Sequence, residues 1–365
     1  MNLELTQEQI ALRDTVRRFL AEKASISDHV RPLLEDPRGV TEPVWQGLAR
    51  LGTTGLLVPE EFGGAGMTMV EAGTVAEELG AALHPGPWLS TAVAATRALT
   101  GLGVDLADRS RLLTGIADGS IVATVVGLGG SKITFDDARL RGAVGAVPDA
   151  AASHILLVLA DDRDGTGLFE VEAASPGVSA TLEDGIDETR KRFRVEFDDA
   201  PARLLARPTP EAVAALVDDA IIAGSADAVG AAHAVMQMAI DYAKVRQQFG
   251  QPIGSFQAVQ HLCVDMFETV ELARSGVLHA LWAADAHPAG GGSPERHLAA
   301  VRAKAFSGRL AEVGDTAIQV FGGIGYTWEH DAHLYLKRLL SWSQFLGSPD
   351  AYLEELGGSL AKSRT

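Results

Sequence analysis

The stretch Arg246-Gln-Gln-Phe-Gly-Gln-Pro-Ile253 ends one long helical pattern, and Gln319-Val-Phe-Gly-Gly-Ile-Gly325 ends another. In the first, a planar guanidinium that is always charged could bind a pyrophosphate, and Phe249 could supply an aromatic face. In the second, glycines leave the backbone open to the close approach of a ligand. Arg246 alone could equally be a cation at a helix C-terminus, and a glycine cluster alone is weak evidence. The two motifs together favour a site for a phosphate-bearing ligand.

Outward from these motifs, the chain divides into regions with different sequence patterns. Apolar residues recur at helical spacing from residue 6 to about 118, and long segments from Pro210 onward repeat this periodicity. Short apolar or alternating runs between them, separated by Gly, Asp and Pro, are typical of strands. The expected strands are Ile121–Val126, His154–Leu159, Gly167–Val171 and Phe193–Phe197. The expected long helices are Ala212–Arg246, Phe256–Ala286, Pro294–Phe321 and Ala332–Phe345.

This order predicts an α+β fold in three parts. We expect a helical N-terminal domain over residues 1–118 and a small antiparallel, β-barrel-like middle domain over residues 119–206. A C-terminal four-helix bundle should follow over residues 207–365. Gly290-Gly-Gly-Ser-Pro294 is expected to connect two of its helices, and Gly250 is expected to stop the helix that precedes Arg246.

Composition excludes several classes of protein. The net charge of −17 argues against a nucleic-acid partner, because phosphate neutralisation needs clustered Lys and Arg. The one local basic cluster, Arg190-Lys191-Arg192, is expected to be a solvated strand edge or turn. The single cysteine, Cys263, forms no intrachain disulfide and is expected to be a buried bystander.

The N-terminus lacks the features of a secretory signal. It has no basic start and no unbroken apolar run, and Thr6 with Gln9 predicts a helix capping box. No apolar stretch reaches the roughly 20 residues of a membrane helix. We therefore expect a cytoplasmic protein without a membrane partner.

The segment Glu329-His330-Asp331-x-His333 contains residue types that bind metals. Its acids are adjacent to the histidines and would point elsewhere, so we expect no metal here. Glu329 and Asp331 are better interpreted as acids at a helix N-terminus.

Further stretches extend the pattern over nearly the whole chain, which then resembles the acyl-CoA dehydrogenase family. Besides the two opening motifs, they are Trp45-Gln-Gly-Leu-Ala-Arg-Leu-Gly52, Val58-Pro-Glu-Glu-Phe-Gly-Gly-Ala-Gly66, Glu77-Glu-Leu-Gly80 and Phe256-Gln257. The resemblance implies FAD bound at the subunit interfaces of a homotetramer or similar assembly. One subunit's β domain would cradle the flavin, while the neighbour would contribute side chains to the pyrophosphate and adenosine. The matching positions here are Arg246, Phe249, Gln257, Gln319, Gly322 and Gly323.

The resemblance also implies a reaction for which this chain lacks a base at either of the family's usual positions. Family members remove a proton α to the carbonyl of an acyl-CoA thioester while hydride passes to the flavin, so a carboxylate base is needed. Most carry it as a Glu 27 residues after the glutamine of the glycine motif, where this chain has Leu346. A minority carry it 26 residues before the arginine, where this chain has Ala220. Neither side chain can accept a proton.

Asp218 and Asp219 are the fallback candidates for the base, since they lie one or two residues from Ala220. A small register shift could present one of them, but Asp is a methylene shorter than Glu. We expect instead a solvent-facing acidic pair. The small residues Ala220 and Gly224 hint at a roomy substrate site.

The middle region departs from the family as well. The loop that touches flavin and thioester usually contains an acid and a proline, whereas this chain has Thr124-Val-Val-Gly-Leu-Gly-Gly-Ser131. An aromatic flavin contact expected later is replaced by Gly142-Ala-Val-Gly-Ala-Val-Pro148. By resemblance, the chain keeps the residues that it lends to a neighbour and weakens its own flavin cradle.

Three functions follow from this comparison. The first is the base-lacking subunit of a heteromeric α2β2 acyl-CoA dehydrogenase, which the wording Tyr326-Thr-Trp-Glu-His-Asp-Ala-His333 favours because it resembles actinobacterial steroid-type members. The second is a homomeric dehydrogenase that uses Asp218 or Asp219 as base. The third is a non-enzymatic scaffold that binds acyl-CoA or FAD. For an enzyme, the resemblance implies an electron-transfer flavoprotein as acceptor.

Overall fold

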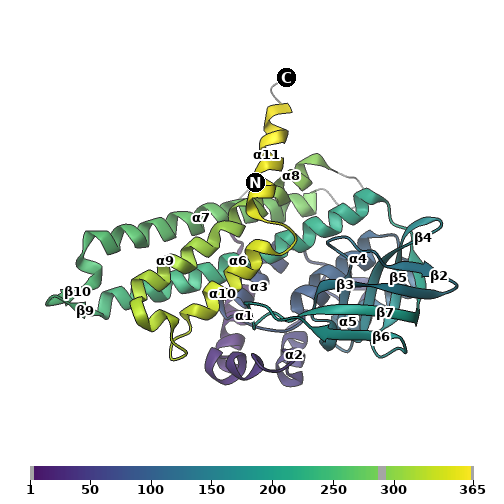
Figure 1. Cartoon of the computed structure of the whole chain (residues 1–365), viewed down its shortest axis with the longest axis horizontal. Coiled ribbons are helices and arrows are strands. Elements are labelled where there is room, and N and C mark those ends of the chain that lie inside the picture. Colours follow the sequence, from purple (N-terminus) through teal and green to yellow (C-terminus); the bar gives the residue numbers. More distant parts are fainter. Residues whose placement is uncertain (1–3, 287–292, 363–365) are drawn as a thin grey trace.

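The computed structural model describes residues 4–286 and 293–362. Figure 1 shows an elongated molecule in which a sheet lies at one end and long helices extend to the other. The N-terminal helices pack between and below them, and the last helix, α11, projects from the body. The predicted order of helices, strands and helices is confirmed.

The N-terminal part is helical as expected. The capping box is present, because the Thr6 hydroxyl accepts from the Gln9 amide and the Gln9 side chain accepts from the Thr6 amide at 2.9 Å. The helices are α1 (Gln7–Lys23), α2 (Glu42–Arg50), α3 (Met69–Ala81), α4 (Thr96–Gly101) and α5 (Leu106–Ala117), with π-helical turns η1 (Ile26–Val30) and η4 (Leu89–Ala95).

The sheet holds the four predicted strands and four more that the pattern did not separate. Its order is β6-β7-β3-β2-β4-β5-β8, and β1 pairs with β4. Most pairs are antiparallel, but β1 and β2 both run parallel to β4, so the sheet is mixed rather than purely antiparallel. The strands are β1 (Ala123–Val126), β2 (Thr134–Asp136), β3 (Arg139–Pro148), β4 (Ile155–Asp162), β5 (Gly165–Glu172), β6 (Val178–Leu182), β7 (Arg192–Pro201) and β8 (Arg203–Ala206).

The C-terminal part is built on long helices. They are α6 (Pro210–Val245), α7 (Gln257–Ala286), α8 (Pro294–Ser307), α9 (Ala311–Phe321), α10 (Ala332–Gln344) and α11 (Pro349–Lys362), with the two-residue strands β9 (Gln247–Gln248) and β10 (Gln251–Pro252) and the 3-10 turn η9 (Gly322–Tyr326). The single helix expected over Pro294–Phe321 is wrong, because a 3-10 turn at Gly308–Leu310 divides it. A side chain at Gly308 would come within 2.5 Å of the Pro349 ring.

Two glycines let α3 and α6 approach each other closely. A Cβ at Gly80 would lie 1.9 Å from the Asp227 carbonyl oxygen, and one at Gly230 would lie 1.8 Å from that of Glu77. Any larger residue would force the helices apart. This contact fixes the part of α6 that carries Asp227 at the centre of the molecule.

Three other predictions concern the periphery of the structure. Cys263 is half-buried on α7, and burial raises the pKa of its thiol, as suits an unreactive side chain. Most of the connector expected at Gly290–Pro294 lies outside the described residues. Within residues 4–286 and 293–362, no helix is both long and apolar enough to cross a membrane.

Candidate functional site

The two opening motifs meet at the end of the molecule that is farthest from the sheet. Arg246 follows α6 directly, and Gly322 follows α9. The rings of Tyr242, one helical turn before Arg246, and Phe321 lie 5.1 Å apart and hold the two helix ends together. Thus residues more than 70 positions apart in the sequence share one surface.

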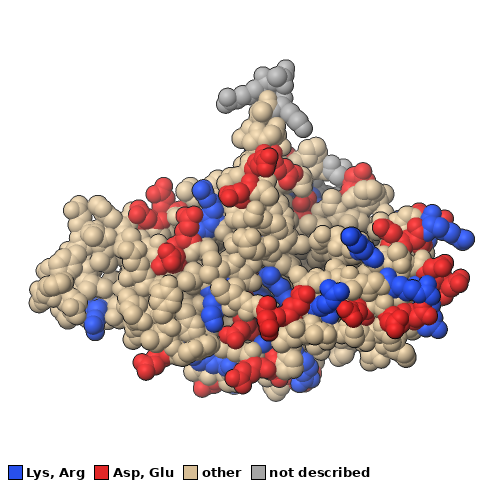
Figure 2. Space-filling view, viewed as in Figure 1, with Lys and Arg blue, Asp and Glu red and all other residues tan. Residues whose placement is uncertain are grey.

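The side chains of this surface point outward. Arg246, Gln257 and Gln319 are exposed, and Phe249 is 91% exposed. Figure 2 shows that this end, where β9 and β10 lie, carries few charged side chains in that view. We name it the lending surface, defined by Arg246, Phe249, Gln257, Gln319, Gly322 and Gly323. An exposed aromatic ring beside a mostly uncharged surface is typical of a face that binds a partner or a ligand.

Phe249 owes its exposure to a tight hairpin. Gln248 pairs with Gln251, so Phe249 and Gly250 form a two-residue turn with φ values of 53° and 82°. Turns with two left-handed residues suit the twist of a hairpin, but a left-handed phenylalanine is unusual. Gly250 is therefore a turn residue, and the prediction that it stops the helix is wrong, since α6 already ends at Val245.

The glycine motif forms the open part of the lending surface. Gly322 has a φ of 66°, and no atom lies within 4 Å of the Cβ positions of Gly322 and Gly323. Gly325, in contrast, is packed against Phe321 and Ile318. The first two glycines thus leave free space over the backbone, which is where a ligand could approach.

A cleft lies between the sheet and the helices α6 and α10, and its inner part is small. It is a cavity of about 100 Å³ whose lining includes Ala220 and Gly224 of α6. The Trp342 ring fills the space above Gly224, where a Cβ would come within 2.4 Å of it. The roomy site expected from Ala220 and Gly224 is therefore not found.

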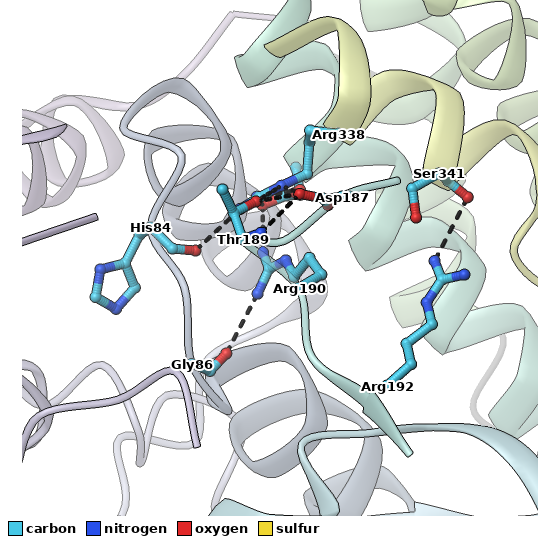
Figure 3. Close-up of polar contacts among 9 residues, drawn as sticks. His84, Gly86, Asp187, Thr189, Arg190, Arg192, Arg338 and Ser341 are labelled. Atoms are coloured by element: carbon cyan, nitrogen blue, oxygen red, sulfur yellow. Dashed lines mark hydrogen bonds and ion pairs between the residues drawn. The ribbon is translucent and has the colours of Figure 1, made fainter. Parts of the chain in front are cut away.

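A buried network of charges lines this inner cavity (Figure 3). The Arg338 guanidinium donates to both carboxylate oxygens of Asp227, at 3.0 and 3.2 Å, and to the Thr189 hydroxyl. Arg190 donates to the same Asp227 at 2.6 Å, and Asp187 lies 3.3 Å from Arg338. Buried charges persist only when they are paired in this way, so the network holds the segment just before β7 against α6 and α10.

The basic cluster Arg190-Lys191-Arg192 is therefore not solvated, and that prediction is wrong. Arg190 belongs to the network, and the buried Lys191 donates to the Leu34 carbonyl. Arg192 lies against the Phe345 ring, 4.5 Å from its centroid. Charge alone suggested exposure, but each of these cations has a partner supplied by a distant segment.

Leu346 lies at the outer side of the cleft. It lines a second cavity, of about 250 Å³, together with the loop Gly127–Gly130 and the strand end Val144–Pro148. Its φ of 56° is left-handed, and the Tyr352 hydroxyl donates to its carbonyl oxygen at 2.6 Å. The position where the base was expected thus faces the loop Gly127–Gly130, whose sequence differs from the family pattern, but it presents an apolar side chain there.

Lys304 supports the cleft wall from behind. This fully buried ammonium donates to the Trp342 carbonyl oxygen at 2.5 Å and lies 3.8 Å from the Trp342 ring centroid. A cation near the C-terminus of α10 also interacts favourably with the helix dipole. Burial lowers the pKa of Lys304 to about 7.

The fallback bases do not face solvent, and that prediction is wrong. Asp219 is 1% exposed and paired with the buried Arg296, while Asp218 is 4% exposed and bonded to His297 at 2.9 Å. Among this stretch of α6, it is Ala220 that lines the cleft cavity. The two carboxylates therefore bind cations on another face of the helix.

The residues considered for a metal have other partners. Asp331 begins α10 and pairs with Arg31 at 2.7 Å, and His330 accepts a hydrogen bond from the amide of Ala332. His333 packs edge-on against Trp328. Within the described ranges, no group of three or more metal-binding side chains is present.

His297 predicts a decline of stability at alkaline pH. Asp218 and Glu355 both bond to its ring, and the pKa of His297 rises to about 9 from the ordinary 6.5. The stabilisation is complete below pH 6.5 and is lost as the pH rises through about 9. We expect His297→Gln to unfold at lower urea concentration than the unmodified chain below pH 6.5, with the difference shrinking above pH 9. An equal difference at both pH values would contradict this contribution.

For Lys304 we expect the opposite pH dependence, a folding stability that increases with pH. Its lowered pKa means that the folded state binds fewer protons than the unfolded state between about pH 7 and 10.5, so stability rises with pH over that range. We expect Lys304→Met to lose this rise in urea titrations. The contribution of His297 to stability falls with pH over part of the same range, so His297→Gln is the matched comparison. If folding stability depended on pH identically in the two variants, both assignments would be refuted.

Profiles of two acyl-CoA dehydrogenase domains match this chain. The profile of the acyl-CoA dehydrogenase N-terminal domain matches residues 6–120, and that of the C-terminal domain matches residues 221–355. Acyl-CoA dehydrogenase IpdE2 of Mycobacterium tuberculosis is 33% identical over 98% of both chains. The chain belongs to the acyl-CoA dehydrogenase family, whose members bind FAD.

Two further comparisons add detail. Acyl-CoA dehydrogenase FadE34 of M. tuberculosis is 34% identical over 96% of this chain, which spans 48% of that longer protein. Among solved structures, a variant of the steroid ACAD Tcur3481-Tcur3483 has a TM-score of 0.87 and 29% identity over 98% of this chain and 99% of that one. The ChsE4-ChsE5 complex of M. tuberculosis has a TM-score of 0.89 at 24% identity, over 99% of both chains, which supports the fold.

Proposed function

We propose that this chain is the base-lacking subunit of a heteromeric α2β2 acyl-CoA dehydrogenase. One contrast carries the proposal: the lending surface is exposed and open, whereas the chain's own cleft is narrowed by Trp342, Phe345 and Leu346. A subunit that binds a neighbour's cofactor needs the exposed surface, but it does not need an open cleft of its own. Two proteins of similar structure, Tcur3481-Tcur3483 and the ChsE4-ChsE5 complex, are named as assemblies of two different chains.

The residues of the lending surface fit the phosphate and adenosine part of FAD. Arg246 would bind the pyrophosphate, Phe249 would cover it, and Gln319 with the open backbone at Gly322 and Gly323 would complete the contact. Gln257 lies at the start of α7 on the same surface. When bound, FAD supplies the acceptor for the hydride. The role of this chain is to bind and orient it.

The partner must supply the base. Proton abstraction α to a thioester requires a carboxylate within hydrogen-bond reach, and neither Leu346 nor Ala220 can provide one. A homologous subunit that retains a Glu at one of these positions would abstract the proton in its own cleft. The relative named a steroid ACAD, Tcur3481-Tcur3483, favours a bulky acyl-CoA as substrate. We place the reaction in the cytoplasm, with an electron-transfer flavoprotein as acceptor.

Co-expression tests the proposal. The chain should be purified alone and together with a homologous subunit that has the Glu. We expect the isolated chain to contain little flavin and to be inactive, and the mixed assembly to contain flavin and reduce it with an acyl-CoA. Full flavin occupancy and turnover by the isolated chain would contradict the proposal.

The homomeric alternative makes a different prediction. If Asp218 were the base, Asp218→Asn would abolish turnover while the flavin spectrum stayed intact. Because its carboxylate is buried and bonded to His297, we expect Asp218→Asn to leave turnover of the mixed assembly unchanged. A turnover loss of more than about tenfold, without loss of flavin, would favour the homomeric enzyme.

The scaffold alternative predicts ligand binding without any flavin reduction, whichever partner is present. Anaerobic addition of acyl-CoA to the mixed assembly distinguishes the two, since only the enzyme loses its flavin absorbance.

A further inference from the structure

The outer cavity of the cleft has features that the proposed function leaves unused. We name it the glycine-loop cavity; it measures about 250 Å³. Its walls are the loop Gly127–Gly130, the strand end Val144–Pro148, Arg192, and the segment Gln344–Leu346. It lies in this chain's own cleft, at a distance from the lending surface.

Arg192 lies between the inner and the outer cavity and lines both. Its guanidinium makes one long hydrogen bond, 3.4 Å to the Ser341 carbonyl (Figure 3), and covers the Phe345 ring. None of the ion pairs among the described residues includes Arg192, whereas Arg190 and Arg338 are each paired with Asp227. Asp187, Glu183 and Asp149 act on Arg192 at longer range than an ion pair, and burial still lowers the pKa of its guanidinium, so an anion in direct contact would stabilise its charge.

The lining of the glycine-loop cavity is selective in charge. The described residues that line it include Arg192 and no acidic side chain, although the Glu183 carboxylate accepts a hydrogen bond from the amide of the wall residue Ala146. The backbone amides of Leu128 and Gly129 donate none of the hydrogen bonds found among the described residues. The cavity therefore offers a cation and free donors, while its other walls are mostly apolar.

The chemistry of the walls narrows the class of ligand. Since Phe345 covers one face of the guanidinium, its edge is left for a planar acceptor, and a carboxylate accepts two parallel hydrogen bonds there. One cation balances a monoanion, whereas a phosphate dianion would remain partly unneutralised. The side chains of Val144, Val147 and Leu346 suit an apolar body.

We propose that the glycine-loop cavity binds a small apolar monocarboxylic acid, with Arg192 as the anchor of its carboxylate. The site lies in this chain's own cleft, whereas the proposed function assigns catalysis to the cleft of the partner subunit. The ligand occupies the outer part of the narrowed cleft in the subunit that lacks the base.

Calorimetric titration of the full-length chain with cyclohexanecarboxylate tests the inference. We expect saturable binding of one molecule per chain, and binding of cyclohexanecarboxamide that is weaker by about tenfold or more, because it lacks the charge. Inorganic phosphate should not compete. Equal binding of the acid and the amide, or displacement of the acid by phosphate, would overturn the assignment.

Two variants locate the binding. Arg192→Gln should weaken it by about tenfold or more, whereas Arg194→Gln, an exposed arginine of the same strand that pairs with Glu196, should leave it unchanged. Gly129→Leu should also abolish binding with Arg192 in place, because the leucine side chain would fill the cavity. Among the described residues, the only atom within 4 Å of a Cβ at Gly129 is Leu346 Cδ2, at 3.7 Å. Wild-type affinity in either Arg192→Gln or Gly129→Leu would overturn the site.

The absorption spectrum of the same sample separates this inference from the proposed function. Flavin bound to the isolated chain would contradict the proposed function. A flavin-free chain that does not bind the carboxylate would overturn the inference alone.

Discussion

Replacing Arg246 with alanine in this subunit, with the partner unchanged, is expected to remove most of the flavin from the mixed assembly. A charge-assisted contact to a pyrophosphate contributes about 1.5–3 kcal/mol, so FAD affinity should fall by roughly 10- to 100-fold. The measurement is the ratio of flavin absorbance to protein after gel filtration, followed by titration with FAD. Activity should return when excess FAD is added.

Two variants control this result. Arg246→Lys keeps the charge but loses the planar fork, so its FAD affinity should be intermediate. Arg50→Ala removes another exposed arginine from the last turn of a helix, α2, and should leave flavin content unchanged. Wild-type flavin content in Arg246→Ala would mean that the lending surface does not bind the cofactor.

Replacing Asp227 with alanine is expected to have the largest effect on folding. The change leaves the guanidinium groups of Arg190 and Arg338 without the carboxylate that both contact in the buried network. Removing one partner from a buried ion pair costs about 3–5 kcal/mol. Urea unfolding should show this as a much lower midpoint.

Asp241→Asn is the matched control because it lies on the same helix in an exposed pair with Lys244. It should leave the unfolding midpoint unchanged. If Asp227→Ala unfolded at the same urea concentration as Asp241→Asn, the network would not stabilise the cleft.

The fold could largely be predicted because its signals are local. Helical spacing and Gly- or Pro-bounded runs gave the order of the three parts, and the capping box at Thr6 fixed the first helix start. The parallel pairing of β1 with β4 could not be predicted, since register and direction depend on contacts between distant segments. The break at Gly308 depends likewise on Pro349, which packs there from 41 residues further along the chain.

The site was predictable in its exposed part and not in its buried part. Arg246 and Gln319 belong to contiguous motifs, so the sequence indicates them directly. Arg192, Lys304 and Trp342 were missed, because their importance arises from contacts between segments that lie far apart in the chain. Helix α8 carries Arg296, Arg302 and Lys304, so the sequence does not indicate which of these cations lies beside Trp342.

The burial of charges explains the two wrong expectations about the surface. Asp219 and Arg190 were expected in solvent because charged residues are rarely buried without partners. Both have partners that the sequence places far away, Arg296 and Asp227 respectively. A close acidic or basic cluster is thus a poor indicator of exposure when opposite charges are available elsewhere in the chain.

The flavin stoichiometry of the purified mixed assembly tests the central claim most directly. If this chain contributes Arg246 to its partner's flavin site and its own narrowed cleft holds no flavin, native mass spectrometry should find one FAD for each pair of different subunits. An assembly with two FAD molecules per pair would place flavin in this chain's cleft and contradict the account.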